Sequence, residues 1–151
     1  MRIGIIWGMS SWADHALAGL SAAGLRRGGA RRTVVEYLDA QRCCRSAQEI
    51  HDGIRDAGGA VGVASVYRAL DTLAALRLVQ RVDVGDGVAR FEPAGGDAHH
   101  HHHHLVCDDC GRVEPFTDDR LERALAGAAG RLGYAREQHE VVLRGACADC
   151  R

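Results

Sequence analysis

The sequence lacks any long apolar run, and this absence excludes the commonest kind of membrane protein. A transmembrane helix needs roughly 20 consecutive, mostly apolar residues, and the apolar runs of this chain are all short. Residues 1–12 have neither the apolar core nor the small-residue cleavage site of a secretory signal. We therefore expect a cytoplasmic protein with no membrane partner.

Two motifs of zinc enzymes are also missing. The chain has no H-E-x-x-H motif and no H-x-E motif paired with P-C-x-x-C, the arrangements in which a metal keeps an open position for a reactive water. A zinc hydrolase built on the histidines is therefore the weaker hypothesis, and we expect no enzyme activity.

Lysine is absent, so all 19 basic residues are arginine, and with 20 acidic residues they give a net charge of −1. The total charge therefore gives no indication of a nucleic-acid partner. One stretch nevertheless sets a cluster of arginines against only Glu36 and Asp39, namely Arg26, Arg27, Arg31, Arg32, Arg42 and Arg45. This cluster is either a nucleic-acid-binding patch or a solvated helix face.

Four of the 6 cysteines form two C-x-x-C pairs, Cys107 with Cys110 and Cys147 with Cys150. In a cytosolic protein this spacing favours metal binding over disulfides. Four thiolates complete the tetrahedral shell of one zinc ion and leave no open position, so this zinc is predicted to be structural. A chain of 151 residues forms one domain or two small ones, and small domains gain most from such a metal.

Six consecutive histidines, His99 to His104, precede the first cysteine pair. The run lies inside the chain and continues directly into apolar residues, unlike a terminal purification tag. If it is a β-strand, His101 and His103 share one face, and His102 and His104 share the other. One strand would then supply ligands to two metal sites.

Residues 13–92 show the pattern of a winged helix-turn-helix domain, whereas residues 1–12 are an extension of unassigned role. Apolar spacing predicts a helix after Ala13, a second after Arg31, and a third that begins with a capping box from Ser46 to Glu49. A fourth helix is predicted over 64–77, with a buried stripe of Val66, Ala69, Leu70 and Leu73.

The opposite face of this fourth helix carries Ser65, Tyr67 and Arg68. A capped helix, a turn and a second helix form a helix-turn-helix, in which the second helix enters the major groove of DNA. A hairpin around Gly85-Asp86-Gly87 adds the wing. The alternative for Tyr67 is a half-buried packing residue.

Residues 93–98 have linker composition and are predicted to be a hinge. Residues 99–151 are predicted to form strands from the histidine run, over 112–116 and over 141–143, with a helix whose inward residues are Leu121, Leu125, Ala128 and Leu132. An exposed sheet edge invites pairing with a second copy. The expected fold class is thus α+β, with an N-terminal winged helix-turn-helix DNA-binding domain and a small C-terminal α/β dimerisation domain.

Four motifs in order resemble the ferric uptake regulator family of metal-responsive repressors: SAQEIH over 46–51, VASVYRAL over 63–70, HHHHLVCDDCG over 101–111 and CADC over 147–150. The first and last are most similar to the zinc uptake branch. The resemblance implies a homodimer that binds an A·T-rich palindromic operator on double-stranded DNA. It also implies that Ser65, Tyr67 and Arg68 contact DNA, and that Arg26 or Arg27 reaches the minor groove.

The resemblance implies two further metal sites. One comprises His101, His103, Glu122 and His139, a mixed set that suits zinc or ferrous iron; the alternative for His139 is an ordinary surface histidine. The other is the sensor, formed by Glu92, His102 and His104, with Cys44 as a fourth ligand. Its ligands come from both sides of the hinge, so metal binding can bias the hinge angle.

The chain departs from the zinc branch at its sensor. Gln80 and Ala94 occupy positions where zinc sensors have an acid and a cysteine, whereas Arg90-Phe91-Glu92 resembles the iron and peroxide sensors. The thiolate of Cys44 would favour zinc. We therefore expect a metal-dependent repressor of metal homeostasis with zinc as corepressor. An iron-responsive or peroxide-responsive regulator and a metal storage or buffer protein are the alternatives.

Overall fold

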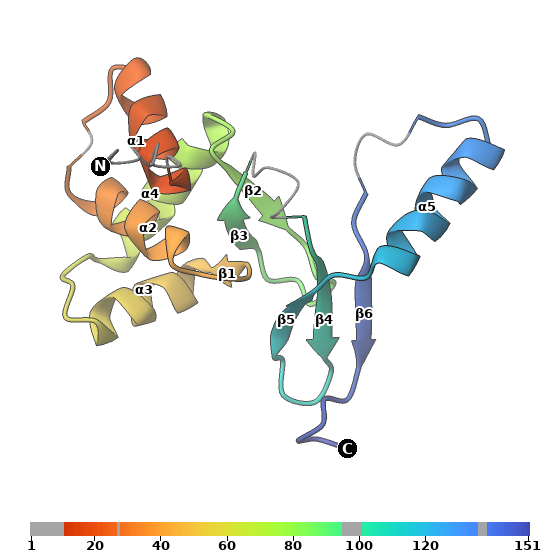
Figure 1. Ribbon diagram of the computed structural model, residues 1–151. Helices are drawn as coiled ribbons and strands as arrows, with labels where there is room; N and C mark the ends of the chain where they lie inside the picture. The colour runs from red at the N-terminus through yellow and green to blue at the C-terminus, as the bar shows by residue number, and fades with distance from the viewer. Residues whose placement is uncertain (1–10, 27, 95–100, 136–138) are drawn as a thin grey trace, which may run out of the picture. The chain divides into compact units, whose positions relative to one another are not determined.

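The computed structural model describes residues 11–26, 28–94, 101–135 and 139–151, and the chain divides into two compact units, Met1–Gly96 and Asp97–Arg151 (Figure 1). The predicted extension over 1–12 and the predicted hinge over 93–98 lie largely outside the described residues. Among the described segments, no helix is long and apolar enough to cross a membrane.

The first unit contains four helices, α1 (Trp12–Ala22), α2 (Ala30–Asp39), α3 (Ala47–Asp56) and α4 (Val63–Ala75). The predicted capping box is confirmed, because the Glu49 N–H donates to Ser46 Oγ at 3.1 Å and the Ser46 N–H donates to the Glu49 carboxylate at 2.7 Å. These two bonds satisfy backbone donors that have no partner within the helix. They fix the start of α3, the first helix of the helix-turn-helix.

One apolar core holds the four helices together. The predicted buried stripe of α4 is confirmed, since Val66, Ala69, Leu70 and Leu73 are all buried there. Full burial of a large apolar side chain contributes roughly 1.5–3 kcal/mol. With that stripe inward, the opposite face of α4 is left for solvent or a partner.

The wing is a hairpin of β2 (Val79–Val82) and β3 (Arg90–Pro93), which confirms the predicted strands around the glycine turn. Gly85 and Gly87 have φ values of 82° and 76°, a region that favours glycine. A third strand, β1 (Arg45–Ser46), pairs with β3 and gives the sheet order β1-β3-β2. Strand β1 was not predicted, because two residues are too few to show an alternating pattern.

The second unit is built on β4 (His103–Cys107), so the strand predicted from the histidine run is confirmed only for its last two histidines. His101 and His102 precede the strand, and residues 99–100 lie outside the described residues. Strand β4 lies at the centre of the sheet, antiparallel to β5 (Val113–Phe116) and parallel to β6 (Val142–Gly145). Helix α5 (Asp119–Arg131) connects the outer strands, and the Asp118 side chain accepts from two backbone N–H groups at its start. Strands and helices together confirm the α+β class.

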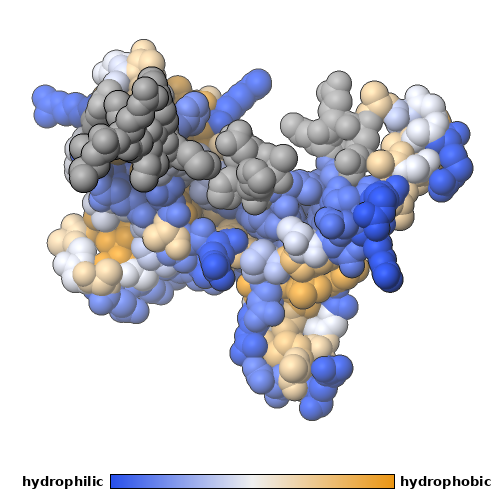
Figure 2. All heavy atoms as spheres, in the orientation of Figure 1, coloured by the Kyte–Doolittle hydropathy of each residue, from blue (hydrophilic) through white to orange (hydrophobic). Residues whose placement is uncertain are grey.

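The predicted inward residues Leu121, Leu125 and Ala128 of α5 are only half-buried in the single chain, so the expected burial is not reached. None of its residues is fully buried, and Leu132, just beyond its end, is 73% exposed. The cause is that, among the described residues, no other helix or strand packs extensively against α5. Leu105 and Leu143 are also exposed on the sheet, where Figure 2 shows a patch of hydrophobic residues.

Candidate metal sites and nucleic-acid interface

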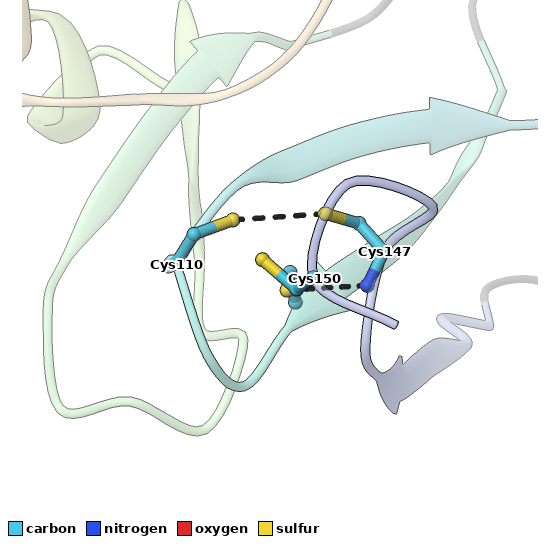
Figure 3. A group of neighbouring side chains, drawn as sticks. Cys110, Cys147 and Cys150 are labelled. Atoms are coloured by element: carbon cyan, nitrogen blue, oxygen red, sulfur yellow. Dashed lines mark hydrogen bonds between the residues drawn. The ribbon is translucent and has the colours of Figure 1, made fainter.

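The cysteines of the two C-x-x-C pairs meet at one end of the second unit (Figure 3). Their four sulfur atoms lie within 4.8 Å of one another, and Cys110 Sγ is 3.9 Å from Cys147 Sγ. A tetrahedral zinc with bonds of about 2.3 Å separates its sulfur ligands by about 3.8 Å. The cluster therefore fits a metal, and the parallel register of β4 and β6, which pairs Cys107 with Gly145, brings the two pairs together.

Backbone amides favour a thiolate at the centre of this cluster. Hydrogen bonds from the N–H groups of Cys110 and Cys147 lower the pKa of Cys107 to about 6. The hydrogen bond with Cys147 contributes most to raising the pKa of Cys150 to about 12, and hydrogen bonds with Cys110 and Cys107 raise it further. The four sulfurs thus share a limited number of negative charges, and a cation that binds them displaces the remaining protons.

A second group of ligands lies around the start of β4, with one residue from α5 and one from the segment before β6. The ligating atoms of His101, His103, Glu122 and His139 lie within 4.8 Å of one another. Glu122 Oε1 is 2.7 Å from His103 Nε2 and 3.1 Å from His139 Nε2, while His101 Nε2 is 3.0 Å from His139 Nε2. Burial, and then the charge of His139, lower the pKa of His101 and so favour the neutral imidazole that binds metal.

The alternating histidines occupy the other face. The rings of His102 and His104 have their centroids 5.0 Å apart, and His104 is only 2% exposed. Glu140 Oε1 lies 3.8 Å from His104 Nδ1, a neighbour that our sequence reasoning missed. Glu140 directly follows His139 in the chain, yet His139 lies beside His101 whereas Glu140 lies beside His104. The adjacency of Glu140 to His139 was the signal in the sequence that could have indicated it.

Within the first unit, Cys44 and Glu92 are both buried. Gln80 Nε2 donates to Glu92 Oε1 at 2.5 Å across the β2–β3 pair. Cys44 Sγ lies 3.9 Å from Cys43 Sγ, and the hydrogen bond with Cys43, burial and the charge of Glu92 all raise the pKa of Cys44. Without a bound cation this thiol therefore stays protonated. These residues form the first-unit half of the predicted sensor, and Gln80 is a partner that the sequence did not reveal.

Helix α4 presents the predicted polar face. Tyr67 is 52% exposed, which disfavours its alternative role as a half-buried packing residue. Arg68 is also exposed, and its guanidinium donates to Ser65 Oγ at 3.0 Å. Arg26 is exposed ahead of α2, while Arg27 lies outside the described residues. Hydroxyl and guanidinium groups on one exposed helix face are suited to phosphate and base contacts in DNA.

The sequence is similar to known proteins of one family. It matches the ferric uptake regulator family over residues 22–144. Over 134 residues it is 37% identical to the zinc uptake regulation protein of Mycobacterium tuberculosis, covering 87% of this chain and 99% of that protein. Over 132 residues it is 35% identical to the ferric uptake regulation protein of Legionella pneumophila, covering 87% and 95%.

The fold is also similar to that of a solved structure. The ferric uptake regulator of Vibrio cholerae matches 86% of this chain and 98% of its own, with a TM-score of 0.74 and 34% sequence identity. A match over 86% of the chain extends into both units.

Proposed function

We propose that this chain, which belongs to the ferric uptake regulator family, is a zinc-responsive repressor of metal-homeostasis genes. Members of the family are metal-responsive transcriptional regulators and not enzymes. The observation that carries this proposal is its similarity to a zinc uptake regulation protein over 99% of that protein's length. The buried thiol of Cys44 beside Glu92 supports zinc, because a soft thiolate favours zinc over ferrous iron.

We assign zinc to the thiolate site as a structural ion. Its four cysteines saturate a tetrahedral shell and leave no position for a reactive water. We call the two turns that carry the cysteines the knuckles, residues 107–110 at the end of β4 and residues 147–150 after β6. Zinc would supply a cross-link between these two knuckles. The chain's own residues contribute the sulfurs and the backbone N–H groups that favour the thiolate form of Cys107.

The sensor is proposed to consist of Glu92 and Cys44 from the first unit with His102 and His104 from the second. Ligands drawn from two domains give a metal ion different affinities for different hinge angles, which is the requirement for a switch. The site of His101, His103, Glu122 and His139, whose ligands all lie in one unit, lacks that property. We infer that it stabilises the second unit instead.

We propose that a homodimer places its two α4 helices in successive major grooves of an A·T-rich palindrome. In that arrangement Tyr67, Arg68 and Ser65 contact bases and phosphates, and Arg26 or Arg27 reaches the minor groove. Guanidinium contacts to phosphates release counterions, so binding should weaken steeply as salt is raised.

The first experiment tests metal dependence. A duplex selected from a random pool by the metal-loaded protein is titrated with the protein in the presence of Zn(II), Fe(II) or a chelator. We expect zinc to raise affinity by about 5- to 150-fold, the usual range for allosteric coupling. Stronger activation by Fe(II) would identify the iron-responsive alternative, for which Glu92 is the suitable ligand. Affinity that is unchanged by metal or chelator would contradict the proposal.

The second experiment separates a repressor from a metal buffer. Replacing both Tyr67 and Arg68 with alanine should weaken duplex binding by roughly 1–3 kcal/mol for each contact, without changing the amount of zinc bound. Asp71→Ala, on the same exposed face of α4, is a control that removes a negative charge and should not weaken binding. A double variant that binds the duplex as tightly as wild type would show that α4 is not the DNA-reading helix.

A further inference from the structure

Two crossed ion pairs connect the cysteine knuckles of the second unit. Arg112 Nη1 lies 2.8 Å from Asp149 Oδ2, and Arg144 Nη2 lies 2.5 Å from Asp108 Oδ1. Asp108 is inside the first C-x-x-C pair, and its partner Arg144 comes just before the second. Asp149 is inside the second pair, and its partner Arg112 comes just after the first.

Each knuckle is therefore tied to the strand segment that flanks the other one. The pairing is reciprocal, because an aspartate inside each knuckle pairs with an arginine beside the other knuckle; the first knuckle also contains Asp109. Both arginines line the same hollow as Cys107 and Cys147. The Arg112 guanidinium also interacts electrostatically with Cys147 and Cys110.

General stability does not account for this arrangement. The four side chains are between 39% and 69% exposed, and exposed ion pairs contribute only about 0–1 kcal/mol each. The local charge gives a better reason. Four thiolates around one divalent ion leave two surplus negative charges, and the three aspartates in the same knuckles, Asp108, Asp109 and Asp149, add three more. Arg112 and Arg144 supply the opposing positive charges at the point where the knuckles meet.

We propose that Arg112 and Arg144 are positioning residues of the thiolate site, which hold the two knuckles in register and stabilise the negatively charged metal-bound state. The proposal rests on the proposed zinc occupancy of that site. The ion pairs should raise the zinc affinity and also slow zinc release. A knuckle that is held in place by its ion pair returns a detached cysteine to the zinc ion before a competing chelator can remove the ion.

The test uses full-length protein loaded with zinc and measures the rate of zinc transfer to an excess of a chromophoric chelator. The double variant Arg112→Gln with Arg144→Gln should lose the thiolate-bound zinc about 10- to 100-fold faster, if the 10- to 100-fold loss of metal affinity typical for removal of groups that support metal ligands is expressed in the release rate. The double variant Arg112→Lys with Arg144→Lys keeps both charges and should remain close to wild type. Arg123→Gln, an exposed arginine on α5 of the same unit, is the matched control and should have no effect.

Salt provides a second readout, because the proposed effect of the two arginines is electrostatic. Raising the ionic strength screens exposed charges, so zinc release from wild type should accelerate towards the rate of the glutamine variant, which should itself respond little. Zinc release from the glutamine variant at the wild-type rate would overturn the proposal. If alkylation of the cysteines shows that wild type holds no zinc on them, the proposed thiolate site fails first, and the two failures are thereby distinguished.

Discussion

Replacing Cys147 with serine is expected to unfold the second unit and abolish the dimer. Among the described residues of this unit, Val106 and Cys107 are the only buried apolar ones, so the unit has very little core of its own. Structural zinc contributes roughly 10–16 kcal/mol of apparent binding free energy in small zinc domains at neutral pH. Loss of one of the four thiolates therefore removes the largest stabilising contribution to this unit.

Circular dichroism, sedimentation and metal content measure the three consequences on the same sample. Ala148→Ser is the matched control, because it places the same hydroxyl between the same two cysteines and should leave the fold, the dimer and the zinc content unchanged. The first unit should survive in the Cys147→Ser variant, since its core is separate. A variant that remained a dimer with a full complement of zinc would show that the thiolate cluster is not the structural site.

Strand and helix periodicity made much of the metal chemistry predictable. Once His102 and His104 were assigned to one face of a strand, His101 and His103 had to occupy the other, and the ring positions agree. The same reasoning placed Val66 and Leu70 inside and Tyr67 outside on α4. These features depend on residues close together in sequence, for which backbone geometry fixes side-chain direction.

The features that escaped prediction depend on contacts between distant residues. Gln80 and Glu92 meet only because β2 and β3 pair in one particular register. Asp149 and Arg112 meet only because β6 adds to β4. Helix α5 was expected to bury its apolar stripe, but its periodicity showed only that one face is apolar and could not tell whether the same chain or a second copy covers it.

Substituting alanine for both His102 and His104 is expected to abolish the response of DNA binding to metal. These histidines are the second-unit half of the proposed sensor, and without them zinc has no reason to prefer one hinge angle over another. The duplex affinity of the variant should stay at the value measured with chelator, so the entire 5- to 150-fold activation, roughly the range of allosteric coupling, should be lost. Fluorescence anisotropy of labelled duplex over a zinc titration measures this loss.

The matched comparison substitutes alanine for His101 and His103, which lie next to them in the same chain segment but contribute to the site with Glu122. Both double variants lose two imidazoles and should each lose about one zinc ion per chain. Only the His102 and His104 variant should lose metal activation, because only that site takes ligands from both units in our proposal, whereas the other should mainly lower the thermal stability of the second unit. The reverse pattern, with activation lost in the His101 and His103 variant alone, would transfer the sensor to the opposite face of β4.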